Sequence, residues 1–207
     1  MTHVRRGDRR AAVRAASFDC PRSTFLWILP LFISALLVVG CASTPPAASP
    51  SLYAPYLLSR DGVLRYRVPT GWFPANTDST EPEKLVFLVR NDYGGSLTVH
   101  EVHLDDNARS HLAEGGLLPL AQLTASLEAG SKSGIISSGP TVVRLNGKEM
   151  CSYEMEFRQN GDRMRVVIVD AGGHVYSVAA LVNGSVGARA AGEIMTAQQA
   201  FVATLKW

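Results

Sequence analysis

The sequence predicts an α+β domain in which an antiparallel β-sheet is covered by helices. The strongest observation is a hairpin signal at Asn146-Gly147, a dipeptide that supplies the positive backbone angles of a two-residue turn. Turns at Asn160-Gly161 and Gly172-Gly173 connect this hairpin to two further apolar segments, which predicts four consecutive antiparallel strands. An apolar stripe at helical spacing near residue 207 completes the pattern, because such a stripe must cover a sheet.

The amino-terminal half supplies three more predicted strands. In Val63–Val68 apolar residues alternate with arginines, so one face of this strand is exposed to water. The Pro69–Trp72 segment then forces a turn. A continuous apolar run at Leu85–Val89 predicts a strand that is buried on both faces. Leu97–Leu104 is the next predicted strand, and a slip in its apolar phase predicts a β-bulge near His100.

The carboxyl-terminal half begins with a predicted helix. Leucines recur at helical spacing over Pro119–Glu128, and proline is tolerated in a first helical turn. The hairpin strands are predicted at Thr141–Leu145 and Lys148–Phe157, and they are followed by strands at Met164–Val169 and Val175–Val182. Together these strands form the predicted antiparallel meander.

A closing helix is predicted after the last strand. Ser185 is its predicted N-cap, because a serine side chain accepts a hydrogen bond from the first helical turn. Gln198 interrupts the apolar stripe where the spacing would place another apolar residue. The stripe itself consists of Ala191, Ile194, Met195, Phe201, Val202 and Leu205.

This order of elements resembles the PsbP-like α/β sandwich. The resemblance rests on the corner at Val68–Trp72, on Tyr153 and Val175-Tyr176 in the meander, and on a final helix with a hydrophobic tail. The photosystem II extrinsic protein P, a Ran-binding nuclear import factor and many bacterial lipoproteins share this fold. The resemblance covers residues 60–207 and implies a non-enzymatic binding or assembly-support role. It carries over no ligand residue.

The first 40 residues are predicted to be an export signal. Residues 1–24 are rich in arginine, and the apolar segment Phe25–Val39 that follows is broken only by Pro30 and Ser34. A permanent membrane-spanning helix needs roughly 20 apolar residues, so this segment is short for one. An uncleaved signal anchor is the alternative interpretation.

A cysteine marks the predicted cleavage site. The segment Val38–Cys41 resembles the bacterial lipobox, which implies cleavage before Cys41 and acyl chains, palmitate among them, on its thiol and amine. Buried methylenes contribute about 0.8 kcal/mol each, so more than one chain attaches a protein stably to a membrane. Ala42 follows in place of an aspartate, which implies sorting to the outer membrane, facing the periplasm, if the host is Gram-negative.

The predicted organisation is therefore a signal peptide at 1–40, a lipidated cysteine and Pro/Ala/Ser-rich tether at 41–59, and one globular domain at 60–207.

The charge balance changes once the signal peptide is removed. Six of the 20 basic residues but only two of the 18 acidic residues precede Cys41, which leaves 14 basic and 16 acidic residues in the mature chain. Because this balance is slightly acidic, it excludes nucleic acid as a partner.

No motif in the sequence predicts catalysis or a cofactor, so we predict no catalytic residues, no cofactor and no enzyme. Cys151 alternates with Tyr153, Met155 and Phe157, which predicts an inert thiol on the buried face of a strand rather than a nucleophile. Glu154 and Glu156 share the other face. That placement favours a solvated edge over a pair of acid/base carboxylates.

A histidine-rich segment is the one candidate for a metal site. It contains His100, Glu101, His103, Asp105, Asp106 and His111. In a regular strand His100 and His103 point to opposite faces, whereas metal ligands must converge on one point. A β-bulge could turn one of them toward the other.

Two hypotheses about function follow. We predict a lipid-anchored, non-catalytic module that binds a protein or another envelope component, without a metal; the alternative is a small envelope metal-binding protein or hydrolase centred on His100 and His103.

Overall fold

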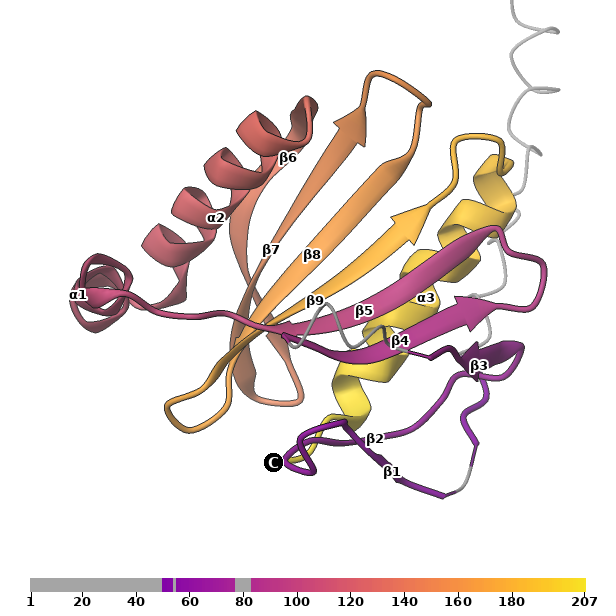
Figure 1. Cartoon of the computed structure of the whole chain (residues 1–207), viewed down its shortest axis with the longest axis horizontal. Coiled ribbons are helices and arrows are strands. Elements are labelled where there is room, and N and C mark those ends of the chain that lie inside the picture. Colours follow the sequence, from indigo (N-terminus) through magenta and orange to yellow (C-terminus); the bar gives the residue numbers. More distant parts are fainter. Residues whose placement is uncertain (1–49, 54, 77–82) are drawn as a thin grey trace, which may run out of the picture. The chain divides into compact units, whose positions relative to one another are not determined.

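A computed structural model of the chain describes residues 50–53, 55–76 and 83–207, which belong to one compact unit, Ala47–Trp207. The export signal and Cys41 lie outside the described residues. Figure 1 shows an antiparallel sheet with helices on both of its faces, which confirms the predicted α+β class. Among the described residues, no helix is both long enough and apolar enough to cross a bilayer.

The described residues contain a large sheet, a small ribbon and three helices. The large sheet is built from β3 (Trp72–Pro74), β4 (Lys84–Arg90), β5 (Gly95–Glu101), β6 (Gly134–Leu145), β7 (Lys148–Phe157), β8 (Arg163–Asp170) and β9 (Val175–Val182). The ribbon consists of β1 (Leu57–Leu58) and β2 (Arg65–Tyr66). The helices are α1 (Asp106–Gly115), α2 (Leu117–Ser131) and α3 (Ala188–Thr204). All neighbours in the large sheet are antiparallel, in the order β3-β4-β5-β9-β8-β7-β6.

The predicted meander is confirmed. Asn146 and Gly147 both have positive φ, at 53° and 77°, and they connect β6 to β7 with Leu145 in register with Lys148. A positive φ at both central residues is what a type I′ turn requires, and few residue pairs other than Asn-Gly adopt it readily. The strands β6, β7, β8 and β9 then follow one another in space as they do in sequence.

Each face of the sheet has its own apolar core. Strand residues alternate between the two faces, so β7 places Met150 on one side and Cys151 on the other. The core under α3 includes Leu88, Leu97, Val99, Val178, Ile194 and Phe201. The core under α2 includes Leu120, Ala121, Ala125, Tyr153, Met155 and Ile168. Because both cores lie wholly within Ala47–Trp207, this unit has what it needs to fold on its own.

The two helical layers cover different parts of the sheet. On one face α2 packs on β6, β7 and β8, and on the other face α3 packs on β9 and reaches β2 (Figure 1). The side of β6, β7 and β8 that faces away from α2 is therefore left partly open beside α3. Residues of the edge strand β6 are mostly exposed.

Several elements differ from the sequence-based expectation. The helix α1 is an additional element, and its N-cap is Asp105, whose side chain accepts a hydrogen bond from the Ala108 backbone N–H at 2.7 Å. The predicted N-cap Ser185 is wrong, because Gly187 occupies that position and Ser185 hydrogen-bonds to Asn183 instead. A glycine cap leaves no side-chain signal in the sequence, which explains the error.

Two expectations for the central strands were right only in part. The bulge near His100 exists, but it lies on β4, where Lys84 pairs with His100 and Val86 pairs with Val99. In β4 itself Phe87 and Val89 are half-buried, so only one face of this strand is fully covered. The apolar run in the sequence could not reveal that one face of β4 is only half-buried. This exposure arises because α2 packs on β6, β7 and β8 and not on β4.

The amino-terminal ribbon begins earlier than the sequence predicts. Leu52 is bridged to Pro69, and Leu57 and Leu58 pair with β2. These residues fall in the segment 41–59 that its Pro/Ala/Ser-rich composition assigned to the tether. Leu57 and Leu58 are both exposed, so they form no alternating pattern that would indicate a strand.

A buried glutamine joins α3 to the sheet. Gln198 is completely buried, and its side-chain Nε2 donates to the backbone carbonyls of Val178 at 2.7 Å and Arg165 at 2.9 Å. Its Oε1 accepts a hydrogen bond from Arg165 Nε at 2.6 Å. The interruption in the apolar stripe is therefore a polar contact that is fully satisfied, as a buried amide must be.

Replacing Gln198 by alanine should destabilise the domain. The change removes the hydrogen bond that Arg165 Nε donates and the two that the Arg165 and Val178 carbonyls accept, and each bond lost to a buried group costs about 1–3 kcal/mol before relaxation. We expect a total loss of about 3 kcal/mol in the free energy of unfolding, measured by urea denaturation. Gln199→Ala is the matched control, because its side chain is exposed, and it should change stability by less than about 0.5 kcal/mol. Equal effects of the two variants would contradict this role for Gln198.

A groove between α3 and the open side of the sheet

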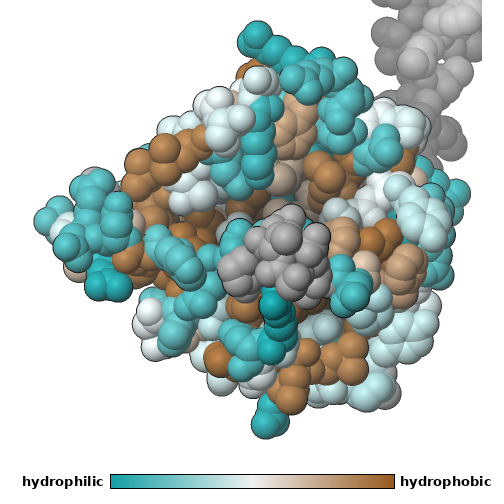
Figure 2. All heavy atoms as spheres, in the orientation of Figure 1, coloured by the Kyte–Doolittle hydropathy of each residue, from teal (hydrophilic) through white to brown (hydrophobic). Residues whose placement is uncertain are grey.

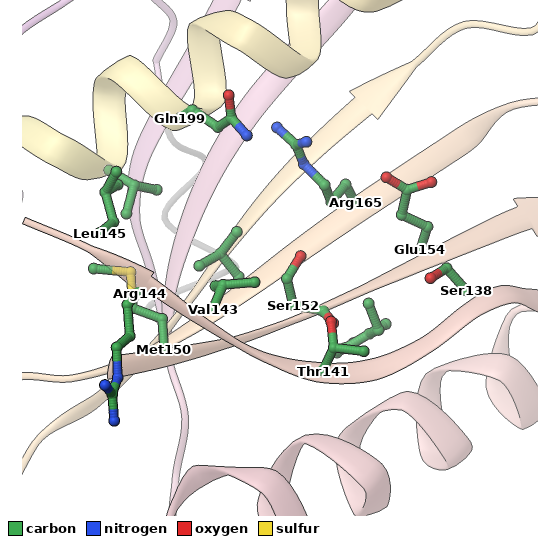
Figure 3. Close-up of a pocket in the computed structure, with 13 residues that line it drawn as sticks. Ser138, Thr141, Val143, Arg144, Leu145, Met150, Ser152, Glu154, Arg165 and Gln199 are labelled. Atoms are coloured by element: carbon green, nitrogen blue, oxygen red, sulfur yellow. The ribbon is translucent and has the colours of Figure 1, made fainter. Parts of the chain in front are cut away.

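A groove of about 250 Å³ lies where the sheet is left open beside α3. Its walls come from β6, β7 and β8 on one side and from α3 on the other, as Figure 3 shows. The alternation of side chains along β7 places Met150, Ser152 and Glu154 on the face opposite α2. Its polar lining residues include Ser138, Thr141, Arg144, Ser152, Glu154, Arg165 and Gln199.

Arg165 is the central charged group of the groove. It projects from β8 toward α3, with Gln199 facing it and Glu154 beside it on β7 (Figure 3). Its guanidinium donates hydrogen bonds to Gln198 Oε1 and to the backbone carbonyl of Met195 on α3. These contacts hold the guanidinium in one place, so the groove has a fixed positive charge at its α3 wall.

The charge of Arg165 lies in a partly desolvated environment. Burial lowers the pKa of the Arg165 guanidinium, and the nearby carboxylate of Glu154 acts in the opposite direction. Glu154 is in register with Arg165 on the neighbouring strand, which places the two side chains on the same face. A cation and an anion are therefore presented next to each other at the groove.

The remaining lining is hydroxyl and aliphatic. Ser152 and Thr141 lie opposite each other across β7 and β6, and Val143 on β6 is 37% exposed. Met150 and Val167 contribute apolar surface from the strands. A site of this kind can hold a ligand that has both polar and apolar parts, because the charges fix its orientation and the aliphatic surface supplies burial.

The histidine-rich segment spans the end of β5, the loop that follows it and the start of α1. His100 lies on β5, His103 lies in the segment after that strand, and Asp105 caps α1. Glu101 is paired with His174 of the β8–β9 turn, with 2.9 Å between Glu101 Oε1 and His174 Nδ1. Among the described residues, no group of three or more His, Cys, Asp or Glu side chains is placed to hold a metal ion.

The other candidate residues are placed as follows. Cys151 is completely buried in the core under α2, and burial followed by the charge of Glu149 raises the pKa of its thiol. This confirms the prediction of a buried thiol, and a raised pKa disfavours the reactive thiolate. Glu156 is exposed, whereas Glu154 is half-buried at the groove and differs from the solvated edge residue expected. The predicted lipidation residue Cys41 lies outside the described residues.

Sequence reasoning did not find the groove or its arginine. Two signals were present: Arg165 lies within an otherwise apolar strand segment, and Gln198 lies within an apolar helical stripe. A single polar side chain within an apolar segment is common in proteins, so neither residue by itself indicates a binding site. Only the packing of α3 on β8 shows that the two polar side chains belong together.

No family model matches the chain, and no curated protein matches its sequence. Solved structures do match. The cyanobacterial PsbP protein CyanoP from Synechocystis sp. PCC 6803 matches with a TM-score of 0.50 at 11% identity, covering 81% of this chain and 98% of that chain. The chain has a PsbP-like fold. At 11% identity the likeness shows the fold alone, and folds of one kind host unrelated functions.

Two further structures match with lower TM-scores. LpqN of Mycobacterium tuberculosis, described as involved in cell envelope biogenesis, has a TM-score of 0.41 at 14% identity and covers 69% of this chain and 82% of that chain. A protein from Bacteroides thetaiotaomicron has a TM-score of 0.45 at 11% identity and covers 73% of this chain. The present chain spans 47% of the length of that protein.

The contact between Arg165 and Gln198 should appear as an energetic coupling. Arg165→Met and Gln198→Ala each remove the same hydrogen bond, so the double variant should lose less stability than the two single variants lose together. We expect a coupling of about 1–2 kcal/mol in urea denaturation. Arg163→Met is the control, because Arg163 lies two residues away on the same strand and is exposed. Additive effects of the Arg165 and Gln198 changes would show that the contact contributes little.

Proposed function

We propose that this chain is a lipid-anchored cell-envelope protein whose globular domain is a non-catalytic module that binds a protein or another envelope component. The observation that carries the binding role is the groove beside α3, with its fixed Arg165 and adjacent Glu154. The guanidinium is held by groups of the domain itself, so it is available to orient a ligand without moving. The identity of the ligand is left open by this proposal.

The envelope location is supported by the sequence before the domain. A basic segment, a short apolar segment and the lipobox-like Val38–Cys41 precede it. The first described residue is Pro50, so a few residues connect Cys41 to the folded unit. We propose that this chain is tethered to the outer membrane on its periplasmic side if the host is Gram-negative.

The groove has features of a binding site more than of a catalytic one. Its charged pair, Arg165 and Glu154, is accompanied by the hydroxyl groups of Ser152 and Thr141 and by aliphatic side chains. A nucleophile needs a base within hydrogen-bond reach, and neither hydroxyl has a histidine among the lining residues of the groove. The alternative centred on His100 and His103 gains no support from the described residues, among which no three His, Cys, Asp or Glu side chains are placed to hold a metal ion.

The anchor is tested by Cys41→Ser. The thiol of Cys41 is the acceptor in the proposed lipidation, so this variant should stay unprocessed and unlipidated in the native host, whereas the parent chain should be cleaved before residue 41. Intact-mass measurement of the purified protein distinguishes the two forms. Cys20→Ser is the matched control and should be processed like the parent chain. Normal processing of the Cys41 variant would rule out the lipoprotein proposal.

The groove is tested by site-specific photocrosslinking in the native host. A photoreactive residue at Val143, which lines the groove, should capture a defined partner, and Ser152→Phe should abolish this capture by filling the groove. The matched control is the same photoreactive residue at Leu127, which is 65% exposed on α2 and lies away from the groove. Thermal denaturation would verify that Ser152→Phe remains folded. Identical capture from both positions, or capture insensitive to Ser152→Phe, would contradict the groove as the binding site.

A further inference from the structure

One outer face of the amino-terminal ribbon combines cations with exposed apolar side chains. Leu58 is in register with Arg65, and Arg65 exchanges backbone hydrogen bonds with Lys206 at 2.8 and 3.0 Å. Directly opposed residues on neighbouring strands share a face, so these three side chains lie in one row. All three are exposed, and Leu58 is 59% exposed. Val63 extends the apolar part of this face and is 48% exposed.

Aromatic rings hold several of the cations on this face. The Arg67 guanidinium lies 4.5 Å from the centre of the Tyr56 ring, and Lys206 Nζ lies 4.6 Å from the same centre. Trp207 follows Lys206 in the chain and is 43% exposed, and Lys148 Nζ lies 3.3 Å from the centre of its ring. We call the outer face of the ribbon together with these neighbours the basic ribbon face; it consists of Tyr56, Leu58, Val63, Arg65, Arg67, Lys148, Lys206 and Trp207.

The acidic side chains next to this face in the sequence have other partners. Asp61 accepts hydrogen bonds from the Val63 backbone N–H at 3.0 Å and from the Ser59 hydroxyl. Glu149 pairs with Arg144 at 3.5 Å. The four cations of the face, Arg65, Arg67, Lys148 and Lys206, outnumber these two carboxylates, so the face presents a net positive charge, although the mature chain as a whole is slightly acidic.

The tether joins the domain on this same ribbon. Thr70 donates its backbone N–H to the Ser51 carbonyl at 2.8 Å, and the Tyr53 N–H donates to the Val68 carbonyl at 3.0 Å, so backbone pairing that leads into the ribbon starts at residue 51. The ten residue steps from Cys41 to Ser51 span at most about 35 Å when extended. A lipid attached to Cys41 would therefore keep this face close to the bilayer that holds the lipid.

We propose that the basic ribbon face docks on the headgroups of a bilayer that contains anionic phospholipid. This inference rests on the proposed anchor at Cys41 for its geometry, but it concerns a separate contact made by the folded domain. Basic side chains are attracted to anionic headgroups, while tryptophan, tyrosine and exposed leucine insert at the interface between headgroups and acyl chains. Figure 2 shows hydrophobic and hydrophilic surface side by side at the lower end of the domain, where Figure 1 places β1 and β2.

The contact would orient the domain as well as strengthen its attachment. The groove lies between α3 and β6–β8, and none of its lining residues belongs to the basic ribbon face, which meets the groove only at one end, where Lys148 pairs with Leu145. With the ribbon against the headgroups, the groove would stay accessible to a partner. A flexible tether alone would leave the orientation of the groove free.

The test uses the unlipidated unit Ala47–Trp207, which contains both of its own cores. The probes are vesicles of phosphatidylcholine with phosphatidylglycerol and vesicles of phosphatidylcholine alone. We expect binding to the anionic vesicles, weakened by added salt, with a blue shift of the fluorescence of Trp207. Trp207→Phe should abolish the shift, because the other tryptophan of this unit, Trp72, is only 5% exposed.

The paired variants Arg65→Gln and Lys206→Gln test which surface binds. Each cation near an anionic membrane contributes about five-fold in affinity, so removing both should weaken binding roughly 30-fold. The matched control is Lys132→Gln with Arg158→Gln, which makes the same change in net charge at the other end of the sheet and should change affinity by less than about two-fold. Circular dichroism would verify that both double variants are folded.

Three results would overturn the proposal. They are equal binding to both kinds of vesicle or to neither, equal loss of affinity in the two double variants, and self-association of the unit that shields Trp207 without vesicles. The last result would assign the face to a second copy of the chain. None of these results depends on lipidation, so failure here is distinguishable from failure of the Cys41 anchor, which the Cys41→Ser experiment measures.

Discussion

The contact of Gln198 and Arg165 determines where α3 sits on the sheet. Gln198 hydrogen-bonds to carbonyls of β8 and β9, and Arg165 reaches from β8 to Gln198 and to the carbonyl of Met195. Apolar packing by itself is non-directional, so it would allow a helix to slide over an aliphatic sheet. Polar groups that are buried and fully paired permit far fewer positions, because any shift leaves some of them without partners.

The position of α3 has a direct consequence for the open side of the sheet. With α3 fixed over β9 and α2 fixed over β6–β8 on the opposite face, the side of β6–β8 that carries Ser152 and Glu154 is only partly covered. The seven strands form a sheet too wide for a single helix, which has a diameter of about 10 Å. The groove is therefore a product of the staggered helices, and the same arginine that holds α3 supplies its charge.

Particular residues show how far the sequence could predict this arrangement. Asn146-Gly147 determined a turn by local backbone preference, so the meander could be predicted without knowledge of any partner strand. The helix α1 and the ribbon strand Leu57–Leu58 were not predicted, because α1 contains few apolar residues and the strand is only two residues long. The histidine-rich segment had the residue types of a metal site, but convergence depends on where β5 ends and α1 begins.

The sequence by itself determined the α+β class, the antiparallel meander, the buried Cys151 and the expectation of an export signal with Cys41 at its end. These follow from periodicity, turn chemistry and composition, which are properties of neighbouring residues. The tertiary structure alone decided that Gln198 meets Arg165, that a groove opens beside them, and that Lys206 lies next to Arg65. Those pairs are distant along the chain, and the packing that joins them comes from the summed burial of two whole cores, which no local pattern records.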